Sequence, residues 1–176
     1  RKSNKMQQLK TVNFSKRDLP IIDMVIIHYT EVSMAKTIEI FQDPNAKVSS
    51  HYMIGKKGGL YQFVREEDKA WHAGDSYWQG RTALNNNSIG IEIVNDGKSP
   101  YTNKQVASLI TLLRDLVKRY NIQLKNILGH SDIAPLRKDD PGILFPWQKL
   151  AEHNLAYYPK SNIAQIDNVH KETFSR

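Results

Sequence analysis

The sequence predicts an α/β fold: a single domain whose central mixed sheet of five or six strands is flanked by helices on both faces. Two runs, 24–29 and 88–94, are apolar and rich in β-branched residues, which is typical of strands buried on both sides. A third stretch, 103–120, repeats apolar residues at three- and four-residue steps, as an amphipathic helix does. At 176 residues the chain is long enough for one well-packed core and too short for two domains.

After the predicted strand 24–29, the sequence pattern indicates a short helix and then a hairpin. Ser33 is placed to cap a helix over 34–42, because its hydroxyl can accept a hydrogen bond from a free amide of the first turn. Residues 51–54 and 60–64 flank Gly55-Lys56-Lys57-Gly58-Gly59, whose glycines tolerate positive φ. This pattern indicates two antiparallel strands joined by a turn.

The second half of the chain predicts a long helix, a short strand and a final helix. Thr102 and Gln105 have the spacing of a capping box at the start of the helix over 103–120. The apolar stripe of this helix is formed by Val106, Leu109, Ile110, Leu113, Leu116, Val117 and Tyr120. Residues 126–129 are expected to form a short strand, and residues 147–153 a short helix. Alternation of strands and helices favours a partly parallel sheet.

The positive charge of the chain is concentrated near its start. The net charge is +7, and +5 of this lies in residues 1–20, which contain six Lys or Arg residues and one aspartate. We interpret 1–20 as a basic segment, either a solvated leader or an arm for anionic lipid or wall polymer. Residues 21–159 are the predicted folded domain, and 160–176 are a tail without periodicity. Because the rest of the chain is nearly neutral, we do not expect a nucleic-acid partner.

The composition of the chain and the length of its apolar runs further restrict the class of protein. The chain has 0 cysteines, so it uses neither disulfides nor thiolate metal ligands. Its apolar runs are much shorter than the roughly 20 residues of a membrane-spanning helix, so no transmembrane segment is expected in this chain. Hydrophobic residues make up 40% and charged residues 24%, which is ordinary for a globular protein.

Two histidines stand where predicted strands end. His28 follows the apolar residues 24–27, and His130 follows the short strand predicted over 126–129. Polar side chains at such positions lie where open α/β sheets keep their sites. A carboxylate, Asp139 or Asp140, follows on a loop that prolines stiffen. Two imidazoles and one carboxylate form a three-ligand zinc set that leaves one position open for water, as hydrolytic zinc sites require.

Glu92 is the candidate general base. It lies inside the apolar run 88–94, where a carboxylate without a function would be costly to bury. Hydrolysis of an amide needs a water nucleophile, a base that takes its proton, and a donor or cation for the oxyanion. The alternative is that Glu92 forms an ion pair with a buried lysine or arginine.

Four motifs occur in one order along the chain. They are His28 after its strand, Trp71-His72-Ala73-Gly74, Asn86-Asn87-Ser88-Ile89-Gly90-Ile91-Glu92, and the stretch 130–147. Together they resemble the zinc-dependent N-acetylmuramoyl-L-alanine amidases, in the superfamily shared with phage amidase lysozymes and peptidoglycan recognition proteins. The resemblance covers residues 21–159 and implies that they form a zinc amidase catalytic domain.

The resemblance also implies roles for single residues. One Zn²⁺ ion would be held by His28, His130 and Asp140, the last being the aspartate that precedes Pro-Gly. Glu92 would act as general base, and Lys138 as the cation that stabilises the oxyanion. Ser50 stands where phage lysozymes and recognition proteins have a catalytic tyrosine. This departure argues against the tyrosine-based variant of the mechanism. It makes Glu92 the stronger candidate for the general base.

Trp71, His72, Arg81 and Arg137 are candidate substrate-binding residues. Sugar rings pack on aromatic planes, and the carboxylates of muramyl peptides suit arginine. The alternative for the aromatic residues is a place in the core. His51 has two interpretations as well: it supports the metal site from outside, or it satisfies a buried carbonyl. His153 and His170 are read as ordinary hydrogen-bonded histidines.

These observations predict a peptidoglycan amidase. It would hydrolyse the amide between the lactyl group of N-acetylmuramic acid, intact or 1,6-anhydro, and L-alanine of the stem peptide, by zinc-activated water. The alternative is a non-catalytic peptidoglycan-binding module on the same fold. The expected partner is peptidoglycan or a muropeptide. Motifs at 49–52, 76–81 and 130–135 most resemble the periplasmic, outer-membrane-associated branch, which predicts the bacterial periplasm. The cytoplasm is the alternative, because the cytosolic branch that recycles anhydro-muropeptides shares most motifs.

Overall fold

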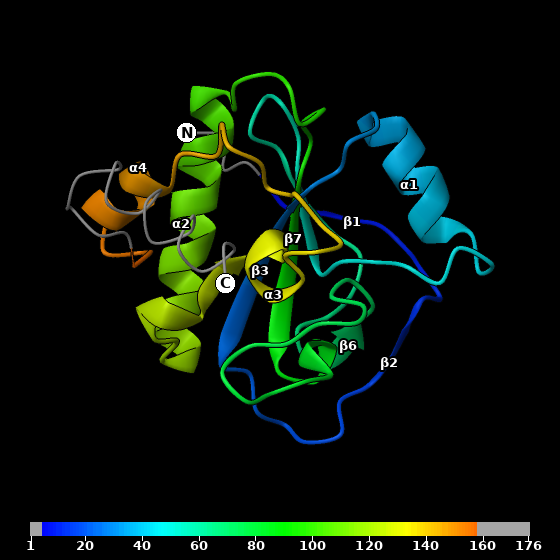
Figure 1. Ribbon diagram of the computed structural model, residues 1–176. Helices are drawn as coiled ribbons and strands as arrows, with labels where there is room; N and C mark the ends of the chain where they lie inside the picture. The colour runs from blue at the N-terminus through cyan, green and yellow to red at the C-terminus, as the bar shows by residue number, and fades with distance from the viewer. Residues whose placement is uncertain (1–4, 158–176) are drawn as a thin grey trace.

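The protein is described by a computed structural model of residues 5–157, built around a six-stranded mixed sheet (Figure 1). Its strands, in spatial order, are β1 (Gln7–Gln8), β5 (Leu60–Gln62), β4 (Tyr52–Ile54), β7 (Ser88–Ile93), β3 (Met24–Tyr29) and β8 (Ile127–Gly129). All neighbouring pairs are parallel except the β4–β5 hairpin. The predicted α/β class, the mixed sheet and the hairpin are therefore confirmed.

The start of the chain differs from the predicted solvated leader. Within 1–20, the structure places β1 in the main sheet and β2 (Phe14–Lys16) antiparallel to β6 (Asp68–Ala70) in a second, two-stranded sheet. The buried side-chain amide of Asn13 donates to three backbone carbonyls, and the guanidinium of Arg17 donates to four. Hydrogen bonds of polar residues therefore hold this segment in place. Because its contacts are polar, the segment shows no apolar periodicity from which its strands could be predicted.

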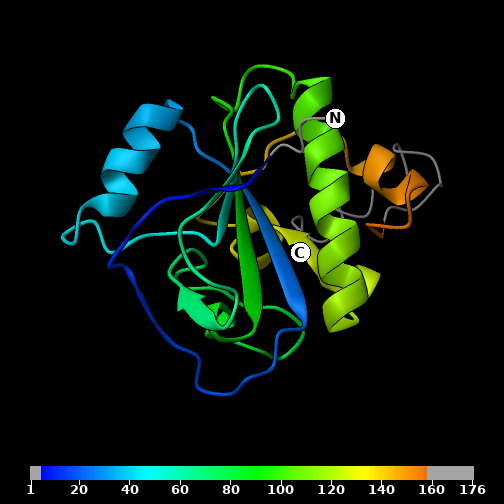
Figure 2. The same ribbon diagram turned by 180° about the vertical axis from the view of Figure 1, so that it is seen from behind.

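Within residues 5–157 four helices accompany the sheet, and three of them were predicted. They are α1 (Met34–Gln42), α2 (Asn103–Tyr120), α3 (His130–Ile133) and α4 (Trp147–Glu152), with 3₁₀ turns at Leu84–Asn86 and Leu124–Asn126. Ser33 caps α1, and Thr102 and Gln105 form a reciprocal capping box on α2. Figures 1 and 2 show α1 and α2 on opposite sides of β3 and β7. None of these helices has both the length and the apolar character needed to cross a membrane.

The core lies on both faces of the sheet because β3 and β7 are buried on both sides. On one face, alternate strand residues pack against α2, forming a cluster that includes Val25, Ile27, Ile89, Ile91, Leu109, Leu113 and Leu116. On the other face, Met24 and Ile26 pack against Leu128 of β8 and Ile133 of α3. His28 follows Met24 and Ile26 on this second face, at the carboxyl end of β3. The predicted tail 160–176, including His170, lies outside the described residues.

Candidate metal centre

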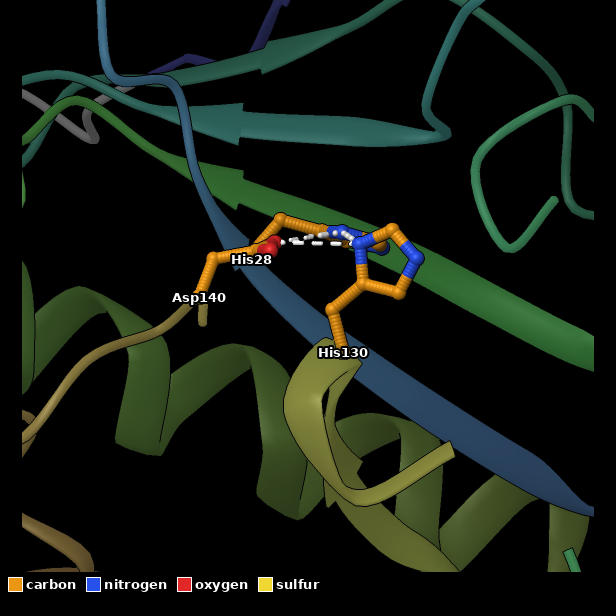
Figure 3. A group of neighbouring side chains, drawn as sticks. All are labelled: His28, His130 and Asp140. Carbon is orange, nitrogen blue, oxygen red and sulfur yellow. Dashed lines mark hydrogen bonds and ion pairs between the residues drawn. The ribbon is translucent and has the colours of Figure 1, made fainter. Parts of the chain in front are cut away.

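Three side chains from separate segments meet at the carboxyl ends of adjacent parallel strands. His28 lies near the end of β3, and His130 begins α3 directly after β8. Asp140 lies on the loop that follows α3. Because β3 and β8 are parallel neighbours, with Ile27 beside Gly129, their carboxyl ends bring the two histidines together. Figure 3 shows the three side chains pointing toward one another.

The converging atoms are two imidazole nitrogens and one carboxylate oxygen. His28 Nδ1 is 3.0 Å from His130 Nδ1 and 2.9 Å from Asp140 Oδ2, and His130 Nδ1 is 3.2 Å from the same oxygen. All three residues are buried. In the part of the chain that the structure describes, no fourth histidine or acidic residue joins this group.

The donor set fits a zinc ion. Tetrahedral ligands at the usual Zn–N and Zn–O distances have their donor atoms about 3.3 Å apart, close to the observed spacings. The other ring nitrogen of His130, Nε2, donates to the carbonyl of Ala73 at 2.9 Å, so Nδ1 carries the lone pair that a metal needs. Two imidazoles and one carboxylate, with no fourth protein ligand in residues 5–157, match an open hydrolytic site.

The protonation states of the ligand set also suit a cation. Burial lowers the pKa of His28, so that its imidazole is neutral, although the hydrogen bond with Asp140 opposes this shift. Burial alone would raise the pKa of Asp140, but hydrogen bonds with His130 and His28 outweigh it and lower that pKa. The site therefore presents an ionised carboxylate beside neutral imidazole.

Glu92 lies beside this cluster. In the parallel pair β3–β7 it is the register partner of His28. Its Oε2 is buried and has no hydrogen-bond partner among the described residues. Burial raises the pKa of Glu92 well above its usual value, the charge of Asp140 adds to the rise, and Lys138 opposes it. The expected alternative of an ion pair with a buried cation is not found for this carboxylate within residues 5–157.

A cavity of about 350 Å³ opens onto the three converging atoms. Its polar lining includes His28, His72, Glu92, His130, Arg137, Lys138, Asp139 and Asp140. Its other wall comes from the loop after β3 and from α1, and includes Val32, Ile40 and Phe41. This apolar wall was not predicted. It could have been predicted from the topology alone, because a loop that follows a strand ending in a metal ligand must pass beside the site.

Two of the predicted substrate-binding residues are not among those that line this cavity. The indole Nε1 of Trp71 donates to Ser15 Oγ at 3.1 Å. Arg81 pairs with Asp23 at 2.9 Å and lines a different hollow. Arg137 does line the cavity, and its Nη2 donates to the backbone carbonyls of Ala73 and Asp75.

Two further histidines, His72 and His51, are not part of the converging group. His72 is buried, and its Nδ1 lies 2.9 Å from Nε2 of His28. His51 accepts from the amide of Gly90 through Nδ1, at 3.0 Å, and donates through Nε2 to the carbonyl of Asp68, at 2.8 Å. Burial lowers the pKa of His51 to about 3, so it stays neutral. Of the two interpretations of His51, the geometry matches the one in which it satisfies a buried carbonyl.

Comparisons with known proteins agree with this geometry. The sequence profile of the family described as N-acetylmuramoyl-L-alanine amidase matches residues 17–143. The chain is 40% identical to N-acetylmuramoyl-L-alanine amidase AmiD of Escherichia coli (strain K12), covering 86% of this chain and 60% of that protein. It is 35% identical to 1,6-anhydro-N-acetylmuramyl-L-alanine amidase AmpD of Haemophilus influenzae, covering 81% of this chain and 89% of that protein.

A solved structure of a relative shows the same fold. It is E. coli AmiD in complex with the substrate anhydro-N-acetylmuramic acid-L-Ala-D-gamma-Glu-L-Lys. The two structures superpose with a TM-score of 0.74 at 41% identity, over 80% of this chain and 60% of that one. The chain thus spans about three fifths of the length of AmiD and nearly all of the length of the AmpD relative.

Proposed function

The chain belongs to the N-acetylmuramoyl-L-alanine amidase family, and we propose that it hydrolyses the amide between the lactyl group of N-acetylmuramic acid and L-alanine of the stem peptide. The observation that carries this proposal is the convergence of His28, His130 and Asp140 beside the buried Glu92, whose Oε2 has no hydrogen-bond partner among residues 5–157. Intact and 1,6-anhydro muramyl peptides are both candidate substrates, and AmiD has been solved with an anhydro-muramyl peptide.

We assign the metal to the three converging residues. His28 and His130 would each supply Nδ1, and Asp140 would supply Oδ2, to one Zn²⁺ ion. When bound there, zinc supplies Lewis acidity for the scissile carbonyl and lowers the pKa of water. The set of two nitrogens and one oxygen supports this assignment, as does the spacing of the donor atoms.

Glu92 and Lys138 complete the chemistry in this proposal. Glu92 takes the proton of the attacking water and then passes it to the nitrogen of the leaving L-alanine. A carboxylate with a raised pKa suits this task, because it must hold the proton between the two steps. Lys138 lines the same cavity, and its ammonium stabilises negative charge that develops on the carbonyl oxygen.

The substrate would lie in the cavity that Glu92 and Lys138 share. Of the four predicted substrate-binding residues, we retain Arg137 as a contact, because it lines this cavity. We do not retain Trp71 and Arg81, since each is engaged with another residue and lines no part of this cavity. His72 also lines the cavity, but both of its ring nitrogens are engaged, with His28 and with Ser88, so we do not retain it as a substrate contact.

We place the protein in the bacterial periplasm, with peptidoglycan or a muropeptide as partner. The motifs at 76–81 and 130–135, which resemble the periplasmic branch, support this assignment, and the cytoplasm is the alternative. We also keep 21–159 as the catalytic domain, with the described part of 1–20 packed against it. Fractionation of the native host, with the protein found in the periplasmic fraction, tests the compartment; recovery in the cytoplasmic fraction would refute it.

The activity is tested with the zinc-loaded chain and a purified muramyl tripeptide, in intact and 1,6-anhydro forms. Mass spectrometry should detect a free peptide that begins with L-alanine together with the peptide-free sugar. The His28→Ala variant is the matched control and should release neither product. Binding of the muropeptide without release of peptide would instead favour the non-catalytic binding module. We disfavour that module because all three candidate ligands and Glu92 are present.

A further inference from the structure

His72 lines the cavity, but its ring contacts the outer nitrogen of His28, Nε2, and not the three converging atoms. Its ring sits against the sheet over Gly90, where a Cβ atom would come within 2.5 Å of His72 Cγ. A glycine in the middle of a fully buried strand weakens that strand, and close approach of another group is the usual reason for it. Here the missing side chain makes the room that the His72 ring occupies.

The ring of His72 connects His28 to the sheet through two hydrogen bonds. His72 Nδ1 lies 2.9 Å from His28 Nε2, and His72 Nε2 lies 3.0 Å from Ser88 Oγ. A neutral imidazole has one N–H and one lone pair. If Nδ1 of His28 faces a metal, its proton must be on Nε2, and His72 Nδ1 must accept it. The proton of His72 then lies on its own Nε2, toward Ser88.

The backbone beside His72 serves the other histidine. The carbonyl of Ala73 accepts from His130 Nε2 at 2.9 Å, which leaves Nδ1 of His130 free of a proton. The amides of His72 and Ala73 both donate to Asn85 Oδ1, at 3.1 and 2.8 Å. One anchored dipeptide therefore contacts the outer nitrogens of both histidine ligands.

We propose that His72 is a positioning residue for the metal centre: it accepts the outer N–H of His28 and so fixes the tautomer in which Nδ1 of His28 faces the ion. This replaces the expectation that His72 binds substrate. Outer partners of this kind hold the ring orientation of a metal-bound histidine and raise its basicity. The inference rests on the metal site of the proposed function.

The test compares two amide substitutions of equal polarity. In His72→Asn the amide falls where Nδ1 was, so an acceptor for His28 remains. In His72→Gln the longer side chain carries its amide toward the position of Nε2, beside Ser88, and the acceptor for His28 is lost. We expect His72→Gln to weaken Zn²⁺ binding on the order of 10–100-fold, and His72→Asn to retain most of the affinity.

The measurement is the Zn²⁺ dissociation constant of the full chain, obtained by competition with a chelator. Urea unfolding in excess chelator checks that each metal-free variant is folded. The control is His153→Gln, because His153 lies at the C-terminus of α4 and contacts Arg114 instead of the site; it should bind Zn²⁺ like the parent. Equal affinities of the Asn and Gln variants, whether both are weakened or both parental, would overturn the proposal.

A spectroscopic readout separates positioning from general support of the fold. In the zinc-loaded parent, the ¹⁵N signals of His28 should report a protonated Nε2 and a metal-bound Nδ1. The same pattern should persist in His72→Asn and change in His72→Gln. An unchanged pattern in His72→Gln would contradict the proposal. Because no substrate is used, these results are independent of whether the chain releases peptide from muropeptides.

Discussion

The two faces of strands β3 and β7 are made of alternate residues of the same strands, yet they differ in kind. The face toward α2 is apolar along its whole length, with Val25, Ile27, Ile89, Ile91 and Ile93. On the opposite face, β3 is apolar at Met24 and Ile26 and polar at His28 near its carboxyl end. The same face of β7 carries Ser88 at its start, then Gly90, and Glu92 beside His28. The α2 face is held by many apolar contacts, whereas on the opposite face hydrogen bonds link His28 to His72 and His72 to Ser88.

The largest effect should come from removing a candidate ligand. His28→Ala takes away one of the three converging atoms, so both bound Zn²⁺ and amidase activity should be lost. The α2 face is untouched, and the variant should still fold. Elemental analysis of the purified variant, with a muropeptide assay, measures both losses. If the variant retained stoichiometric zinc, His28 would not be a ligand. The face of β3 that carries His28 would then no longer differ from the α2 face as the metal-binding one.

A smaller but still large loss is expected for Glu92→Gln. The amide cannot take a proton from water, and general-base catalysis contributes about 10²–10⁴-fold, so kcat should fall by that factor. Zinc content should be unchanged, because Glu92 is not among the three converging residues. Steady-state kinetics measure the loss. The matched control is Glu39→Gln on the exposed side of α1, which should be fully active. A nearly active Glu92→Gln would disprove the base assignment.

On the α2 face the expected effect is on stability alone. Leu113 is fully buried in the cluster between α2 and the sheet, so Leu113→Ala should lower the free energy of unfolding by about 2–5 kcal/mol. Zinc affinity and kcat, measured where the variant is folded, should match the parent. Thr111→Ala, on the exposed side of the same helix, should stay within about 0.5 kcal/mol. A loss of zinc affinity in Leu113→Ala would show that the two faces are coupled.

The smallest effect is expected at the rim of the α2 face, where polar residues serve stability. Burial alone would raise the pKa of Glu66, but hydrogen bonds from Arg119, Tyr120 and Tyr52 outweigh it and lower that pKa to about 2. The folded pKa lies below the ordinary value of 4.5, so ionised Glu66 stabilises the fold above about pH 4.5. This contribution is lost as the pH falls toward about 2.

Urea unfolding of the parent and of Glu66→Gln tests this pH dependence. The variant should be less stable near neutral pH, and the difference should shrink as the pH is lowered through the window between the two pKa values. A difference that stays constant under acid conditions would mean that the carboxylate does not carry the stabilisation.

Much of the fold was predictable because it depends on local patterns. The helix Asn103–Tyr120, with its capping box, was predicted with its observed bounds, since one apolar stripe and one cap specify it. Strand β3 was predicted in the same way. Strands β1 and β2 were missed, because they are short, polar and held by hydrogen bonds from residues such as Asn13. Helix α3 was missed because it is only four residues long.

The sequence alone determined which chemical groups the site contains: a histidine at a strand end, a second before a proline-rich loop, and a glutamate in an apolar run. Those signals are visible because the two histidines stand where apolar strands end and Glu92 interrupts an apolar run. Tertiary structure decided which groups meet. It set Trp71 and Arg81 away from the cavity and put His72 behind His28. Such contacts depend on strand register and on the space that Gly90 leaves, and both are settled only when distant segments pack.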